Sequence, residues 1–135
     1  MARKFKFFNV VLVLTILLVL TGCSTSTGSK INFIGESKHW IVSYSITETQ
    51  SQSSTARISY KGSDVESVGL VKYSFEASPY VKQNGIMKIS QKGYFESTSN
   101  SSKGPYPNKD LVIMVKIEWN GQSENIDLRH TNQQL

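Results

Sequence analysis

The stretch DLVIMVKIEWNGQSENIDL, residues 110–128, decides the fold class. Apolar side chains occupy every second position of its first half: Leu111, Ile113, Val115, Ile117 and Trp119. A period of two is typical of a β-strand with one buried face. Asn120-Gly121 follows directly, and this pair favours a type I′ turn because both central residues of that turn need a positive φ. The stretch therefore predicts an antiparallel hairpin.

The register of this hairpin follows from its two-residue turn. The expected partners are Trp119 with Gln122, Ile117 with Glu124, Val115 with Ile126, and Ile113 with Leu128. Apolar residues then meet on one face everywhere except beside the turn. Because a slip of one residue would turn every side chain to the other face, this agreement supports the register.

Similar alternation extends over much of the chain. It predicts strands at 39–47, 56–60, 64–75, 86–90, 94–98, 110–119 and 122–128, with loops at 48–54, 77–85 and 99–109. About seven short strands without a convincing helix predict an all-β fold, an antiparallel β-sandwich of the immunoglobulin-like kind. Trp40 and Trp119 are the expected core fillers, since the chain offers no pair of cysteines for an inter-sheet disulfide.

The segment from Asp64 to Phe75 leaves two interpretations open. Ser63 and Glu66 have the spacing of a helix capping box. Gly69 and the β-branched residues favour a strand instead. In the strand interpretation, which we prefer, a β-bulge near Gly69 would bring both Val68 and Leu70 to the core.

The segment 1–22 differs in kind from the rest of the chain. Arg3, Lys4 and Lys6 precede an apolar run from Phe7 to Leu20. A basic start followed by a short apolar segment and small residues is typical of a secretory signal peptide. The apolar run is shorter than the roughly 20 residues that a spanning helix needs.

The end of this leader, Leu20-Thr21-Gly22-Cys23, resembles the lipobox of bacterial lipoprotein precursors. The resemblance implies that Cys23 receives a diacylglyceryl group and that cleavage occurs between Gly22 and Cys23. Two acyl chains suffice for stable membrane attachment, whereas one chain binds only marginally. It further implies a protein held at the outer face of the cell membrane.

We therefore expect four segments along the chain. They are a signal peptide at 1–22, a lipidated cysteine with a Ser/Thr-rich tether at 23–37, the sandwich at 38–128 and a polar tail at 129–135. Cleavage would lower the net charge from +5 to +2, because three cations leave with the leader. The remaining lysines are scattered among acids, so no nucleic-acid partner is predicted.

Three short motifs carry a second resemblance, which covers most of the mature chain. They are Gly35-Glu36-Ser37-x-x-Trp40, Tyr60-Lys61-Gly62 and Trp119-Asn120-Gly121. They are similar to motifs of small, uncharacterised cell-surface lipoproteins of Gram-positive bacteria. This resemblance implies a location at the cell surface and brings no established activity with it.

Residues with catalytic or ligand-binding spacing are not apparent. His39 and His130 are far apart and interpreted as surface residues, so no metal site, cofactor or catalytic residue is predicted. Loops that display lysine and tyrosine are the candidate binding elements. Their residues are Tyr80, Lys82, Lys103, Tyr106 and Lys109. They would suit an anionic wall polymer, lipid headgroups or a protein.

The leading hypothesis is thus a membrane-anchored, extracellular, non-enzymatic domain that binds or scaffolds a partner. One alternative is an accessory subunit of a membrane transporter or cell-wall assembly, in which the partner supplies the activity. A less favoured alternative is a hydrolase with an unrecognised site. A deep polar cleft containing a strongly perturbed titratable pair would support that last alternative.

Overall fold

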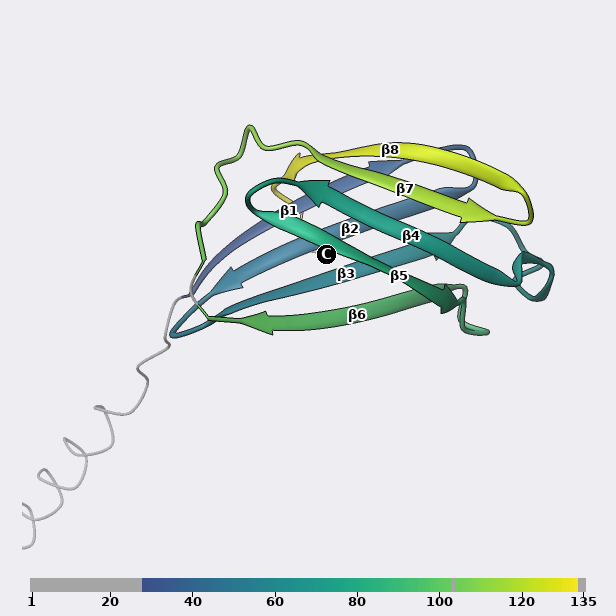
Figure 1. The fold of residues 1–135 in the computed structure, drawn as a ribbon, viewed down its shortest axis with the longest axis horizontal. Helices are drawn as coiled ribbons and strands as arrows, with labels where there is room; N and C mark the ends of the chain where they lie inside the picture. Colours follow the sequence, from purple (N-terminus) through teal and green to yellow (C-terminus); the bar gives the residue numbers. More distant parts are fainter. Residues whose placement is uncertain (1–27, 103, 134–135) are drawn as a thin grey trace, which may run out of the picture.

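The computed structural model describes residues 28–102 and 104–133, and strands make up most of this part of the chain (Figure 1). In order they are β1 (Ser29–Glu36), β2 (Trp40–Glu48), β3 (Gln52–Tyr60), β4 (Leu70–Ala77), β5 (Val81–Lys88), β6 (Tyr94–Ser101), β7 (Ile113–Trp119) and β8 (Gln122–Thr131). A 3₁₀ turn, η1 (Glu66–Val68), precedes β4. Within the described ranges, no helix has the length and apolar character to cross a membrane.

All eight strands belong to one antiparallel sheet with the order β5-β4-β7-β8-β1-β2-β3-β6. The sheet folds over on itself, and β8 forms the corner. Residues 122–128 of β8 pair with β7, and residues 129–131 pair with β1. The prediction of an all-β antiparallel sandwich is confirmed, with eight strands in place of about seven.

The core lies between the two layers and is made by the alternating inward side chains. In β7 every second residue from Ile113 to Trp119 is buried. Trp40 on β2 is fully buried, and its ring centroid lies 5.2 Å from that of Trp119 in an edge-to-face arrangement. The expectation that these two tryptophans fill the core is confirmed.

The predicted hairpin between β7 and β8 is confirmed in both turn and register. Asn120 has φ 44° and Gly121 has φ 72°, as a type I′ turn requires. All four predicted residue pairs occur in the structure. The turn is also tied to the preceding loop, because the Asn120 side-chain amide donates a hydrogen bond of 2.7 Å to the carbonyl oxygen of Ser67.

Replacing Gly121 by alanine should lower the free energy of unfolding by about 1–2 kcal/mol, the cost of left-handed backbone for a residue with a Cβ. No atom lies within 4 Å of the position of the added Cβ, so the effect is one of backbone strain alone. Urea unfolding measures it. Ser123→Ala, at an exposed position of β8, is the control, and equal stability of the two variants would contradict the turn geometry.

Both ends of the predicted sandwich need correction. Residues 29–36, expected in the tether, form β1, because Ile31 and Phe33 are buried between β2 and β8. The polar tail expected at 129–135 begins later, since β8 continues to Thr131. The sheet therefore starts at Ser29, shortly after Cys23, which itself lies outside the described residues together with the leader.

Two loops are shorter than predicted and a third is shifted along the chain, because polar residues join strands. β3 begins at Gln52 within the expected loop 48–54. β6 continues to Ser101 into the expected loop 99–109, and β7 begins only at Ile113, three residues later than the strand predicted at 110–119. β5 begins at Val81, so Asn84-Gly85 lies inside a strand and makes no turn. The Tyr73 ring covers Gly85 from the opposite strand, where a Cβ would lie 2.8 Å from the Tyr73 hydroxyl.

Neither interpretation of the segment 64–75 is fully right. A short 3₁₀ turn buries Val68, and Gly69, with φ 67°, ends that turn so that β4 begins at Leu70 in a new phase. This break replaces the expected bulge. As a result Val71 points into the core, whereas Leu70 is 69% exposed and lies on the outer face instead of in the core.

The strands run between two ends of the sandwich, which we name the Gly28 end and the Asn120 end. The Gly28 end, on the left in Figure 1, carries Gly28 and the β2–β3, β4–β5 and β6–β7 connections. The Asn120 end carries the β1–β2, β3–β4, β5–β6 and β7–β8 connections. Because neighbouring strands are antiparallel, this division follows from the strand order.

Candidate functional site

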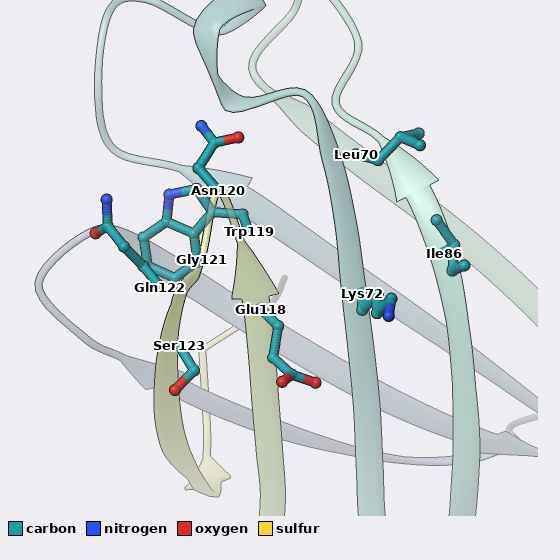
Figure 2. A pocket seen from close by; sticks show the side chains of 9 residues that line it. All are labelled: Leu70, Lys72, Ile86, Glu118, Trp119, Asn120, Gly121, Gln122 and Ser123. Atoms are coloured by element: carbon teal, nitrogen blue, oxygen red, sulfur yellow. The ribbon is translucent and has the colours of Figure 1, made fainter.

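A shallow depression of about 370 Å³ lies on the outer face of the layer formed by β5, β4, β7 and β8, at the Asn120 end (Figure 2). Leu70 and Lys72 of β4, Ile86 of β5 and Glu118 of β7 surround it, and the β7–β8 turn closes one side. Its lining combines aliphatic surface with one cation and one anion. We take this depression as the candidate functional site.

Two exposed aliphatic side chains give the site its apolar character. Leu70 is 69% exposed and Ile86 is 63% exposed. The β4–β5 register pairs Leu70 with Lys88 and Lys72 with Ile86, so Leu70 and Ile86 are diagonal neighbours on one face. Such a pair contributes little to the core, which makes it available for contact with another molecule.

The charges beside the aliphatic pair are unevenly neutralised. Glu118 forms an ion pair with Lys116, and Glu118 Oε1 lies 3.2 Å from Lys116 Nζ. Lys72 lies directly opposite Glu118 in the register, yet Lys72 forms no ion pair with any described residue. The same is true of Lys82 and Lys88, both of which point outward from β5. Within the described ranges, the edge of this layer therefore carries unneutralised ammonium groups.

A second polar cluster lies at the Asn120 end, on the β1–β2 connection. The His39 ring nitrogen Nδ1 lies 2.5 Å from Glu124 Oε1, and the His39 backbone N–H donates to Glu124 Oε2 at 3.2 Å. The His39 ring also packs edge-on against Trp119, with 5.6 Å between centroids. His39 is thus half-buried and joins the β1–β2 connection to β8 through Glu124. The prediction that His39 is a plain surface residue missed this role.

The surroundings of Glu124 lower the pKa of its carboxyl group. Burial acts to raise that pKa, but the nearby Ser37 hydroxyl, the hydrogen bonds from His39 and the charge of His39 outweigh it. A carboxylate whose pKa is lowered in the folded state stabilises that state above its ordinary pKa. This stabilisation is lost as the pH falls through the lowered value.

Acid should therefore weaken the fold partly through Glu124. We expect the free energy of unfolding to decrease as the pH falls below the ordinary carboxyl value of 4.5, and Glu124→Gln to make this decrease shallower. Urea unfolding at a series of pH values measures it. Glu36→Gln is the control, because that side chain is 68% exposed. An unchanged slope in Glu124→Gln would contradict the prediction.

The candidate binding-loop residues are dispersed in the structure. Lys82 lies on β5, on the same strand as Ile86, and is exposed. Tyr80 and Lys109 are at the Gly28 end and exposed, and Lys103 is outside the described residues. Tyr106 is half-buried against the core, where burial and the nearby Glu48 carboxylate raise its pKa. None of these residues lines the depression, and Lys82 shares only its strand with Ile86.

Sequence reasoning missed Leu70, Lys72 and Ile86, which line the site, and Lys88, which pairs with Leu70. The parity of β5 could have indicated Ile86, since Lys82, Asn84 and Lys88 share its face. Leu70 gave no such signal, because its direction depends on the break at Gly69.

The described part of the chain holds no group of three or more His, Cys, Asp or Glu side chains that could bind a metal ion. Gly22 and Cys23, the predicted cleavage and lipidation residues, lie outside this part. Comparison of the chain with protein-family models, with curated proteins and with solved structures found no match.

Proposed function

We propose that this protein is a lipid-anchored domain of the outer cell surface that binds a partner without catalysis. In this proposal the precursor is cut between Gly22 and Cys23, and the diacylglyceryl group on Cys23 inserts into the membrane. The β-sandwich then presents the depression beside Leu70 and Ile86 to its surroundings. The basic leader, its apolar run and the lipobox support the anchor.

The position of the site in the fold is the observation that carries the proposal. Only Ser24 to Thr27 separate Cys23 from Gly28 in the sequence, and such a short stretch reaches little way even when fully extended. An anchor at Cys23 would therefore hold the Gly28 end close to the lipid headgroups. β1 runs from this end to the other, so the full length of the strand separates the Asn120 end from the anchor. The depression is at that outer end.

A second candidate function is that of an accessory subunit of a membrane transporter or cell-wall assembly. The observation that favours it is the position of the depression beside β5, a strand at the edge of the sheet. Such an edge suits a protein partner better than a small ligand. Co-purification from detergent-solubilised membranes tests it, since an accessory subunit should bring one partner in stoichiometric amount.

Replacing Cys23 by alanine should abolish attachment of the lipid, because it removes the only thiol in the chain. We expect an uncleaved precursor of higher apparent mass and no acyl label, measured by cell fractionation and incorporation of labelled fatty acid. Ser24→Ala is the control and should behave as the parent chain. A Cys23→Ala variant that appears as the same processed membrane species would overturn the anchor.

A further inference from the structure

We infer that β5 binds an acidic, extended segment of a partner protein as an added antiparallel strand, with an aliphatic side chain of that segment packed against Ile86. The inference rests on the proposed function as a surface binding domain and names the chemistry of the partner. It combines three observations: a free strand edge, unneutralised lysines along it and an exposed aliphatic pair.

The first observation is the free edge. Among the described residues, β5 pairs with β4 alone, β6 pairs with β3 alone, and no pairing joins β5 to β6 (Figure 1). β5 is eight residues long and contains no proline that would remove a backbone donor. An edge of this kind offers a row of backbone N–H and C=O groups to an incoming strand.

The second observation is the charge along that edge. Lys82 and Lys88 project outward from β5, and Lys72 projects outward from the next strand. Glu76 on β4 lies opposite Lys82, and Glu118 on β7 is already paired with Lys116. The outer face of β5 and β4 thus carries more positive than negative charge. An acidic partner complements it and would approach faster at low ionic strength.

The third observation fixes the pattern of the partner. Side chains of an added strand alternate between two faces, so every second one lies beside Lys88, Ile86, Asn84 and Lys82 in turn. An acid next to Lys88, an aliphatic residue next to Ile86 and an acid next to Lys82 would complement this face. The aliphatic residue would lie against Ile86, on the side away from Leu70, and would extend the apolar surface that Leu70 and Ile86 form (Figure 2).

The same lysines act against a second copy of this chain as the occupant. In an antiparallel pairing of two β5 strands centred on Gly85, Lys82 of each copy lies opposite Lys88 of the other. Like charges directly opposite destabilise strand pairs. Lysine on an edge strand is a common protection against self-association, and here it also selects the charge of the partner.

Binding of a synthetic peptide to the full-length chain in detergent micelles tests the inference. The probe is a fluorescein-labelled octapeptide with glutamate at positions one and seven, valine at position three and threonine elsewhere. We expect saturable binding by fluorescence anisotropy that weakens with added salt. Hydrogen exchange should slow in the amides of β5 on binding, because added-strand pairing occupies them, and stay unchanged in β6.

The double variant Lys82→Glu, Lys88→Glu should weaken binding about tenfold, whereas Lys109→Glu at the Gly28 end should leave it unchanged. All three side chains are exposed, so each variant should fold, which circular dichroism checks. Ile86→Ser should also weaken binding.

Absence of binding, equal binding by the charge-reversed variant, or protection in β6 instead of β5 would overturn the inference. Self-association of the chain through β5 without peptide binding would also do so. None of these results bears on membrane attachment through Cys23. The proposed anchor is tested separately, by the Cys23→Ala variant.

Discussion

Replacing Trp40 by alanine is expected to lower the free energy of unfolding by about 3–5 kcal/mol, the usual cost of truncating a buried tryptophan. Trp40 is fully buried, and its ring lies 5.1 Å from Tyr60 and 5.2 Å from Trp119 between centroids. These contacts join β2, β3 and β7 at the Asn120 end. Because a domain of this size has about 5–15 kcal/mol in total, much of its stability would be lost.

Circular dichroism during urea unfolding measures this loss without relying on tryptophan fluorescence, which the substitution itself changes. Ile41→Ala is the matched control, since Ile41 is the next residue of β2 but points outward and is 38% exposed. It should cost about 1 kcal/mol or less. If Trp40→Ala lowered the free energy of unfolding no more than Ile41→Ala, the burial of Trp40 between the two layers would be contradicted.

Replacing Gly35 by valine is expected to cost about 3 kcal/mol, at the upper end of the range for overpacking. A Cβ at Gly35 would lie 2.5 Å from the carbonyl oxygen of Asp127 and 2.9 Å from side-chain atoms of Ile126 and Leu128. The backbone oxygen belongs to β8 and cannot move aside like the end of a side chain. Here β1 and β8 approach too closely for any other residue.

Thermal unfolding of Gly35→Val beside Gly104→Val measures this effect. Gly104 is exposed, and its nearest neighbour is the flexible end of the Gln52 side chain, 3.3 Å from an added Cβ. Neither glycine has a positive φ, so backbone strain is absent from both. Equal unfolding temperatures for the two variants would show that β8 does not lie so close to β1 at Gly35.

The parts of the fold that the sequence predicts are those whose information is local. The turn and register of the β7–β8 hairpin were predicted, because the turn type and the alternation on each side lie within one continuous stretch of chain. β2 was predicted for the same reason, with Trp40 and Val42 on one face. Trp40 and Trp119 belong to the core because no other place suits such large apolar rings.

The parts that it does not predict depend on partners far along the chain. β1 looks like a tether until Phe33 is placed between β2 and β8. The start of β3 is polar, and it is a strand because Gln52 and Thr55 pair with β2 and β6. Asn84-Gly85 has the composition of a turn, but the Tyr73 ring occupies the space that a side chain at Gly85 would need.

The candidate site was beyond prediction for a related reason. Its apolar pair exists because the break at Gly69 sets the phase of β4 and the β4–β5 register then places Ile86 beside Leu70. Neither relation can be read from spacing. Lysine and tyrosine in loops were a poor guide, since Tyr106 packs against the core and Lys82 lies on a strand.

Pairing of the first strand with the last has a consequence for the order of folding. Phe33 of β1 lies opposite His130 of β8, and the two rings are 6.4 Å apart between centroids. Contacts between residues so distant in sequence require closure of a long loop and form slowly. β1, synthesised first, can complete its pairing only after β8 has emerged. A chain crossing a membrane from its N-terminus would therefore stay incompletely folded until nearly its whole length had passed.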